Sequence, residues 1–263
     1  MNINERHEFI ARELEEKGQV SVTELSVMLN VSEVTIRKDL SLLESNNILY
    51  RAHGKAIKRS PYINDRDVNV KEQQAPAEKI AIGRQAVELI EPNDSIIIAS
   101  GTTVHYFARE IINIIPQTHL TVITSALNVA STLSKNQNIE VIQLGGIVRN
   151  TSLSAVGGDA ERQMENFAGS KLFIGVDGLD LEYGLSTTNL LEANLNRAMM
   201  QAAQKTIVLC DSSKFGRRGF SRICSVDDVD HIITDSNIPQ HTLRALEGRG
   251  IKVSIVSAET FNK

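Results

Sequence analysis

The chain has few of the residues that stabilise small secreted domains. Its 263 residues include two cysteines, no tryptophan and only 4% aromatic residues. Cys210 and Cys224 show neither a CxxC spacing nor a neighbouring histidine, so we expect two buried, reduced thiols rather than a disulfide or a metal site. The six histidines form no metal-spaced set. We therefore expect no bound metal and no cofactor.

Long apolar runs and a leader segment are also missing. No apolar run approaches the ~20 residues of a membrane-spanning helix. The first five residues lack the basic and apolar regions of a secretory signal. We therefore expect a cytoplasmic protein without membrane contact.

The net charge is only −4, which argues against a general nucleic-acid coat and favours one localised basic surface. Residues 1–33 hold three Lys/Arg and seven Asp/Glu, whereas residues 34–60 hold six and two. Residues 61–263 hold 19 and 23. The positive balance is thus confined to residues 34–60, the segment that should face phosphate.

The stretch from Ser21 to Arg59 predicts two short helices, a turn and a basic hairpin. Ser21 and Glu24 have the spacing of a capping box, so a helix should begin near Val22. Its apolar stripe is expected from Leu25, Met28 and Leu29. Ser32 can cap a second helix after the break at residues 30–32. This order is that of a winged helix-turn-helix, a DNA-reading module.

The second helix has the pattern of a recognition helix. Ile36, Leu40 and Leu43 recur at helical spacing and should face inward. Glu33, Thr35, Arg37 and Lys38 are then turned toward solvent near its N-terminal end, where such helices meet base edges and phosphates.

The flanking segments complete the module. A charged segment from about Asn4 to Lys17 stops at Gly18 and predicts a supporting first helix. Residues 48–51 and 56–58 flank Gly54, which suits a hairpin wing with a glycine at its bend. A module of this shape that mediates only protein contacts is the alternative, in which Arg37 and Lys38 form an ordinary solvated face.

The rest of the chain predicts a larger α/β domain. Residues 60–76 are polar and punctuated by prolines, as in a linker, so the domains expected are 1–59 for DNA binding, 60–76 for the linker and 77–263 for the α/β part. Strands and helices then alternate, which favours a largely parallel sheet. The expected strands start near residues 95, 120, 139, 172, 206, 231 and 252.

Loops at the ends of these strands hold the candidate ligand-binding residues, because ligands of such sheets bind at the carboxyl ends of strands. The loop Ser100, Gly101, Thr102 and Thr103 opens a helix and could hold a phosphate, although a capped turn needs no ligand. Lys214 follows a strand end at Asp211, and it could meet that carboxylate or a phosphate. Asp177 could accept from sugar hydroxyls or cap a turn, and Glu192 could serve a ligand or the helix dipole.

Several motifs resemble the DeoR family of bacterial sugar-responsive transcriptional regulators. They are Val34-Thr-Ile-Arg-Lys-Asp-Leu40, Leu43-Glu44, Arg51-Ala-His-Gly-Lys-Ala56 and, in order and spacing, the strand-end loops of the α/β part. The resemblance runs from about Arg6 to Val256. It implies an N-terminal winged helix-turn-helix followed by an α/β sensor similar to ribose-phosphate isomerase.

The resemblance also implies functional residues. It carries over Thr35, Arg37 and Lys38 as DNA contacts of the helix, and Arg51, His53 and Lys55 as DNA contacts of the wing. In the sensor, Ser100, Gly101, Thr102 and Thr103 would hold the phosphate of a sugar or polyol with Lys214 as the cation, and Gly145, Gly146, Asp177 and Glu192 would face the sugar. The expected partners are operator DNA, a phosphorylated sugar or polyol and further copies of this chain, as a dimer or tetramer.

Three positions depart from the family pattern. Lys55 replaces a usual wing glycine, which would make the wing stiffer and more cationic. Ala99 and Ser125 stand where the family commonly has Asp and Asn, so a carboxylate and an amide expected near the ligand are missing. The effector or its affinity should therefore differ from the family norm.

Two rival functions come from other classes. A sugar-phosphate isomerase could use Glu192, Asp177 and Lys214 as its acid-base and polarising groups, but it has little use for a basic winged module. A scaffold protein explains neither the wing nor the glycine-rich strand ends. The sequence therefore favours a homo-oligomeric repressor of a sugar or polyol catabolic operon, without enzymatic activity, released from DNA by a phosphorylated effector.

Overall fold

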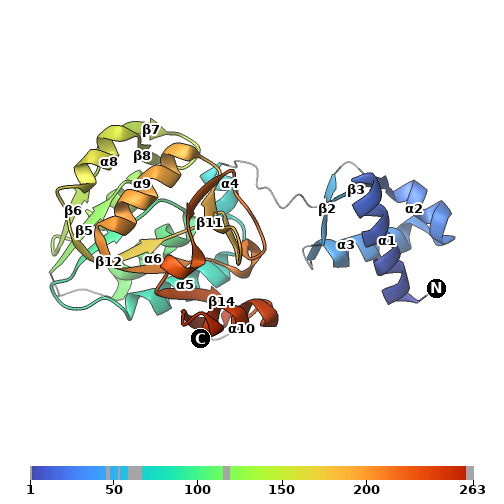
Figure 1. The fold of residues 1–263 in the computed structure, drawn as a ribbon. Helices are drawn as coiled ribbons and strands as arrows, with labels where there is room; N and C mark the ends of the chain where they lie inside the picture. Colours follow the sequence, from blue (N-terminus) through green and yellow to red (C-terminus); the bar gives the residue numbers. More distant parts are fainter. Residues whose placement is uncertain (1, 46–47, 53, 59–66, 115–118, 259–263) are drawn as a thin grey trace. The chain divides into compact units, whose positions relative to one another are not determined.

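The computed structural model describes residues 2–45, 48–52, 54–58, 67–114 and 119–258. Contacts divide the chain into two compact units, Met1–Pro61 and Tyr62–Lys263. Figure 1 shows the mostly helical first unit, in blue, and the α/β second unit.

The first unit is a winged helix-turn-helix. Its elements are α1 (Ile3–Lys17), β1 (Gln19–Ser21), α2 (Val22–Leu29), α3 (Glu33–Ser45), β2 (Leu49–Ala52) and β3 (Lys55–Lys58). The three short strands form one antiparallel sheet in the order β1-β3-β2. The expected helices and hairpin wing are thereby confirmed.

Local signals place the helix ends. The Glu24 backbone N–H donates to Ser21 Oγ at 3.1 Å, while the Ser21 N–H donates to Glu24 Oε2 at 2.8 Å, which completes the predicted capping box. Ser32 caps α3 by accepting from the Thr35 N–H at 3.2 Å. Helix α1 ends at Gly18, whose φ of +73° is the left-handed conformation that glycine adopts without strain.

Apolar side chains from all three helices form the core of the first unit. Ile36, Leu40 and Leu43 are at most 1% exposed, as the inward-facing stripe of α3 predicts. Met28 is 45% exposed, so its assignment to the apolar stripe of α2 was wrong. Val22, Leu25 and Leu29 form that stripe instead, because they lie at the spacing that faces α3.

A buried ion pair fixes α1 on α3. Arg6 donates from Nε and Nη2 to the Asp39 carboxylate at 2.7 and 3.0 Å, and His7 lies 3.4 Å from the same group. Asp39 is only 3% exposed. Because both oxygens of Asp39 are engaged from α1, this residue of the recognition helix serves the fold and leaves its neighbours Arg37 and Lys38 to face outward.

The second unit is built on a seven-stranded parallel sheet. The strands, in the order β15-β14-β12-β9-β4-β5-β6, are β15 (Lys252–Val256), β14 (His231–Asp235), β12 (Ala203–Leu209), β9 (Gly169–Ile174), β4 (Ser95–Ile98), β5 (Leu120–Thr124) and β6 (Ile139–Gln143). All neighbouring pairs are parallel. The seven strands expected from the sequence are these seven.

Helices cover both faces of this sheet (Figure 1). One core contains residues of α5 (Pro76–Val87), α6 (Thr102–Ile114) and α7 (Leu127–Leu133), and the other contains residues of α8 (Gly158–Met164), α9 (Leu190–Gln201) and α10 (Gln240–Gly248). Ile97 belongs to the second core, and its neighbours Ile96 and Ile98 belong to the first. A strand buried on both faces reads as an uninterrupted apolar run, which is why β4 was recognisable from the sequence.

Further elements were not anticipated from the sequence. A hairpin of β7 (Ile147–Arg149) and β8 (Ser154–Val156) and a second sheet of β10 (Gly178–Asp180), β11 (Gly184–Thr187) and β13 (Ser221–Cys224) lie beside the main sheet. Helix α4 (Val68–Glu72) and the 3-10 turns η1 (Ser212–Lys214) and η2 (Val226–Asp228) are short. Helix α4 falls inside residues 60–76, which were expected to be linker. It belongs to the second unit, where its Val68 side chain is buried.

Within the described residues, no helix is both long and apolar enough to span a membrane. Cys210 and Cys224 are free thiols. Burial raises the pKa of Cys224 to about 12 and raises the pKa of Cys210 still further above the ordinary range, so neither thiol is poised to react at neutral pH.

Candidate DNA-reading surface and effector cavity

The exposed side of α3 carries the helix residues that were expected to read DNA. Arg37 and Lys38 are exposed, and Thr35 is half-buried with its Oγ1 2.9 Å from Ser32 Oγ. Arg37 Nη2 donates to Glu33 Oε2 at 2.7 Å, one turn earlier on the same helix. The N-terminal half of α3 therefore presents two cations to solvent, one of them oriented by an acid.

The wing residues have different surroundings. Lys55 is exposed at the start of β3, beside the turn at Gly54. Arg51 is tied to α3, because its Nε donates to Glu44 Oε2 at 2.7 Å and its Nη1 to Ser41 Oγ at 2.8 Å. His53 lies outside the described residues. Arg51 thus docks the wing on the recognition helix whatever else it contacts.

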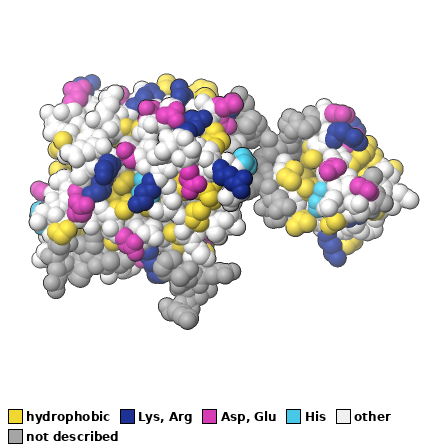
Figure 2. Space-filling model, turned by 60° about the horizontal axis from the view of Figure 1, so that its bottom comes forward, with side chains coloured by type: hydrophobic (Ala, Val, Ile, Leu, Met, Phe, Trp, Pro, Cys, Tyr) yellow, Lys and Arg dark blue, Asp and Glu magenta, His cyan; other side chains and the backbone are white. Residues whose placement is uncertain are grey.

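On the face drawn in Figure 2, the second unit carries charges of both signs rather than one basic surface. There, Lys and Arg side chains alternate with Asp and Glu over the larger body. This pattern agrees with the balance of 19 Lys/Arg and 23 Asp/Glu in residues 61–263. Such a mixed surface attracts a polyanion weakly.

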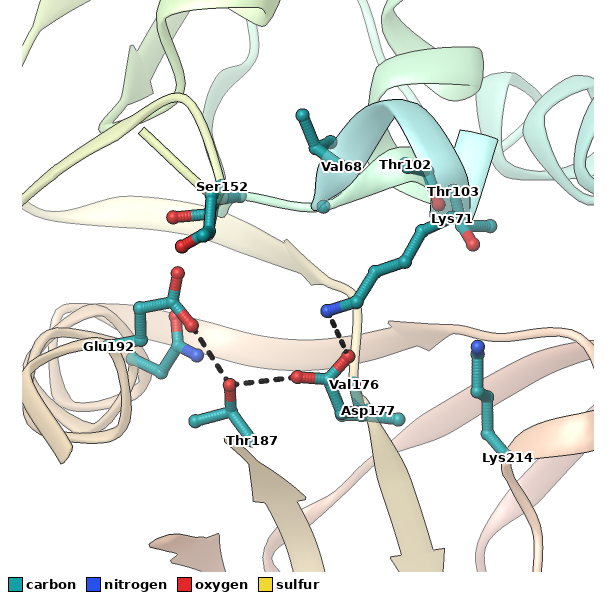
Figure 3. Close-up of a pocket in the computed structure, with 15 residues that line it drawn as sticks. Val68, Lys71, Thr102, Thr103, Ser152, Val176, Asp177, Thr187, Glu192 and Lys214 are labelled. Atoms are coloured by element: carbon teal, nitrogen blue, oxygen red, sulfur yellow. Dashed lines mark hydrogen bonds and ion pairs between the residues drawn. The ribbon is translucent and has the colours of Figure 1, made fainter. Parts of the chain in front are cut away.

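A cavity of about 50 Å³ lies at the carboxyl ends of the parallel strands. It is lined by α4, the loop before α6, the β7–β8 hairpin, the end of β9, β11, the start of α9 and η1 (Figure 3). Seven of the nine expected effector residues line it, namely Ser100, Gly101, Thr102, Thr103, Asp177, Glu192 and Lys214.

Gly145 and Gly146 are not part of this lining. Gly146 has a φ of +145°, and a Cβ there would lie 2.7 Å from the Val156 backbone oxygen. Gly145 donates its N–H to Gln163 Oε1 at 3.0 Å. In this structure the two glycines serve the tight turn into β7. Ala99 and Ser125, the positions that depart from the family pattern, are buried and do not line the cavity either.

The phosphate-loop candidate occupies the N-terminal end of a long helix. Strand β4 ends at Ile98, Gly101 turns the chain with a φ of +134°, and α6 begins at Thr102. Thr102 and Thr103 are at most 8% exposed. The first N–H groups of a helix have no partner within it and, with the helix dipole, favour an anion at this end.

Lys214 supplies a cation on the same side of the cavity (Figure 3). Its Nζ lies 3.8 Å from Asp211 Oδ2, which is an ion pair but exceeds hydrogen-bond distance. Asp211 is itself occupied, since its Oδ1 accepts from the Ser213 N–H at 3.1 Å. Lys214 therefore remains able to donate hydrogen bonds to an anion in the cavity.

Two carboxylates lie elsewhere around the cavity and share one hydroxyl. Thr187 Oγ1 lies 3.1 Å from Asp177 Oδ2 and 3.0 Å from Glu192 Oε2, and its single proton can satisfy one of them at a time. Glu192 also accepts from Arg149 Nη1 at 3.0 Å. These carboxylate oxygens are suited to accept hydrogen bonds from the hydroxyl groups of a ligand.

Asp177 is paired with a lysine that sequence reasoning did not find. Lys71 Nζ donates to Asp177 Oδ1 at 2.7 Å (Figure 3). Burial alone would raise the pKa of Asp177, but the charge and hydrogen bond of Lys71, aided by Lys214 and Thr187, hold that pKa below its usual value. Lys71 was missed because it lies in a segment read as linker, without apolar periodicity to mark its helix.

A second lysine, Lys79 of α5, holds the backbone of α4 at Lys71. Lys79 is 1% exposed, and its Nζ donates to the Lys71 backbone oxygen at 2.6 Å. Burial lowers the pKa of Lys79 to about 8, against an opposing effect of Asp211. The helical pattern of α5 identified its apolar face but gave no sign that this lysine is turned inward.

Family models match nearly the whole chain. Residues 6–61 match the DeoR-like helix-turn-helix domain, and residues 74–236 match the DeoR C-terminal sensor domain. About half of the chain also aligns with ribose 5-phosphate isomerase A of Methanocaldococcus jannaschii, with a TM-score of 0.39 and 18% identity over 52% of this chain and 53% of that chain. That likeness is too weak to say anything about the cavity.

Several relatives match along nearly their full length and are named as regulators. A protein of Escherichia coli O157:H7 named for repression of the aga operon is 38% identical over 96% of this chain and 94% of its own length. The HTH-type transcriptional regulator YulB of Bacillus subtilis, itself uncharacterized, is 37% identical over 97% and 98%. The lactose phosphotransferase system repressor of Staphylococcus epidermidis is 32% identical over 90% and 94%. The chain belongs to the DeoR family of helix-turn-helix transcriptional regulators.

Proposed function

We propose that this protein represses a sugar or polyol catabolic operon and is released from its operator by a phosphorylated sugar or polyol. The proposal takes α3 as the helix that enters the major groove, with Thr35, Arg37 and Lys38 as contacts, and the wing, with Arg51, His53 and Lys55, as the part that follows the backbone. Two copies are needed to read a two-fold operator, so the active species is a homo-oligomer.

One observation carries the effector assignment. The cavity combines an anion-binding helix end and Lys214 on one side with two hydroxyl-accepting carboxylates, Asp177 and Glu192, on the other (Figure 3). A phosphate monoester with several hydroxyl groups matches both sides at once. A sugar without phosphate leaves the helix end and Lys214 without an anion, and inorganic phosphate leaves the carboxylates without donors.

The same geometry favours a sensor over an isomerase. A catalytic base must be free to accept a proton from the substrate. Glu192 is instead ion-paired with Arg149 at 3.0 Å, and Asp177 with Lys71 at 2.7 Å. The names of the full-length relatives likewise describe regulators.

A binding assay tests the effector class. The unfolding temperature of the protein is measured with a panel of sugar and polyol phosphates, each paired with its unphosphorylated parent and with inorganic phosphate. We expect one phosphorylated compound to raise the unfolding temperature and its parent to leave it unchanged, because binding to the folded state stabilises by mass action.

Two variants locate the site. Lys214→Ala should abolish this shift, whereas Lys205→Ala, an exposed lysine on β12, should keep it. A phosphorylated ligand that still stabilises Lys214→Ala at the same concentration would remove Lys214 from the proposed site. Equal stabilisation by a compound and its unphosphorylated parent would remove the phosphate assignment.

A further inference from the structure

The effector cavity is small in this structure. Its volume is about 50 Å³, whereas sites for small organic ligands are on the order of 300–1,000 Å³. A phosphorylated sugar can enter only if part of the wall moves. The identity of that part decides how binding is communicated to the DNA-binding unit.

Helix α4 is a wall with little apolar anchoring. It has five residues, of which only Val68 is buried, and Val70 is 52% exposed. The walls formed by the loops after β4 and β9 and by helices α6 and α9 are instead continuous with the two apolar cores. Short segments with few buried apolar contacts open at the lowest free energy.

Polar contacts hold α4 in place from several sides. The Val68 N–H donates to the Thr151 backbone oxygen at 2.8 Å, and Glu72 accepts from Arg109 Nη2 at 2.7 Å. Lys79 donates to the Lys71 backbone oxygen, and Lys71 donates to Asp177. Of these contacts, only the Lys71–Asp177 pair joins two side chains that line the cavity.

The ligand and Lys71 compete for one acceptor. Asp177 Oδ1 accepts from Lys71, and its Oδ2 lies within reach of Thr187 and Thr188. Each carboxylate oxygen can accept two hydrogen bonds, so the competition arises for a ligand hydroxyl that takes the position of Lys71 Nζ on Oδ1. Removing Lys71 from this carboxylate takes away the contact that draws α4 over the cavity.

Helix α4 is also the first described element after the DNA-binding unit. That unit ends at Pro61, and α4 begins seven residues later at Val68. Any displacement of α4 changes the point at which the chain to the DNA-binding unit leaves the sensor. The same helix thus lines the effector cavity and is the first described element of the sensor.

We propose that the Lys71–Asp177 ion pair is a latch that holds α4 closed over the empty cavity, and that opening this latch takes the protein out of its DNA-competent arrangement. The proposal rests on the repressor function proposed above and deepens it. It assigns Lys71 as a competitor of the effector rather than one of its ligands.

The test needs no effector. Lys71→Met keeps the length of the side chain but removes its charge, and Glu72→Gln weakens α4 from outside the cavity. Lys205→Met is the matched control, because it removes the same charge from an exposed site on β12. For each protein, backbone hydrogen exchange in residues 67–75 and affinity for operator DNA are measured without any ligand.

We expect Lys71→Met to lose protection in α4 and to bind operator about 5- to 150-fold more weakly, the range of a typical coupling between sites. Glu72→Gln should change both quantities in the same direction by less, and Lys205→Met should match the unmodified protein. If Lys71→Met does not fold, as judged by circular dichroism, the protection and operator affinity of Glu72→Gln decide whether the latch exists.

Unchanged protection of α4 in the variants would show that there is no latch. Lost protection with unchanged operator affinity would show that α4 does not communicate with the DNA-binding unit. Either result overturns the proposal. Failure of the unmodified protein to bind any operator would instead refute the repressor function itself.

Discussion

Arg37 and Glu33 form an ion pair of 2.7 Å across one turn of the recognition helix. Thr23 of α2 donates to the other oxygen of Glu33 at 2.8 Å, so the acid is fixed by both helices of the motif. The Arg37 side chain remains 60% exposed. The free protein therefore presents a guanidinium that is partly oriented before DNA is met, which lowers the entropy lost on binding.

Arg37→Ala should weaken operator binding by about 1–3 kcal/mol if Arg37 reads a base edge. Affinity for the effector should not change, since Arg37 belongs to the other unit. Fluorescence anisotropy with operator and with a scrambled duplex measures the effect. Arg12→Ala, which removes an exposed arginine of α1, is the control. An equal loss of affinity for both duplexes would assign Arg37 to phosphate rather than to a base.

Lys38 and Lys55 should act through phosphate. Replacing either by alanine should weaken binding to operator and to unrelated DNA alike, and should reduce the slope of log affinity against log salt by about 1. The measurement is a titration at several salt concentrations. A salt slope identical to that of the unmodified protein would show that the lysine lies away from the phosphates in the complex.

Arg51 has a structural role that can be separated from any DNA contact. Because it bonds Glu44 and Ser41 on α3, Arg51→Ala should lower the free energy of unfolding of the first unit by about 1 kcal/mol. Glu44→Ala should produce a similar loss while keeping the Arg51 charge. Denaturant unfolding of both variants, followed by operator binding, measures the two effects. Stability unchanged in both variants would contradict the docking role.

Lys79 predicts a specific dependence of stability on pH. Its folded-state pKa of about 8 lies below the unfolded value of about 10.4, so between these values the unfolded chain binds more protons and stability rises with pH. Below pH 8 the folded state bears the full cost of the buried charge. Lys79→Met should therefore gain stability relative to the unmodified protein at pH 7, and this difference should shrink by up to roughly 3 kcal/mol as the pH approaches 10.

Denaturant unfolding of both proteins at pH 7 and pH 10 checks this prediction. Lys205→Met serves as the control, because an exposed lysine should give the same small difference at both values. A Lys79→Met difference that does not vary with pH would show that Lys79 is not charged and desolvated in the folded protein.

The main elements of both units could be predicted because local signals and packing agree there. Ser21, Ser32 and Gly18 mark helix ends by their own hydrogen bonds or backbone conformation, independently of the rest of the fold. Strands such as β4 are buried on both faces and so read as apolar runs. The prediction that Met28 belongs to the apolar stripe failed because the side of α2 on which Met28 lies faces solvent rather than α3.

Most of the predictable cavity residues follow strand ends that carry their own signal, and Glu192 opens a recognisable helix. Ser100–Thr103, Asp177 and Lys214 follow apolar strands, and parallel strands bring their ends to one edge of the sheet. Lys71 and Thr187 reach the cavity from a short helix and a small antiparallel strand, and Arg149 of another such strand bonds the lining residue Glu192. Those elements have only three to five residues, too few for an apolar period to mark them in the sequence.

The central claim is that one chain reads DNA and senses a phosphorylated sugar or polyol. The most direct measurement is fluorescence anisotropy of the protein on its own upstream DNA, at one fixed salt concentration, with and without the panel of phosphorylated compounds. The account predicts saturable, sequence-selective binding that one phosphorylated compound reverses and its unphosphorylated parent does not. Absence of binding even at low salt, or selective binding that no compound in the panel alters, would contradict it.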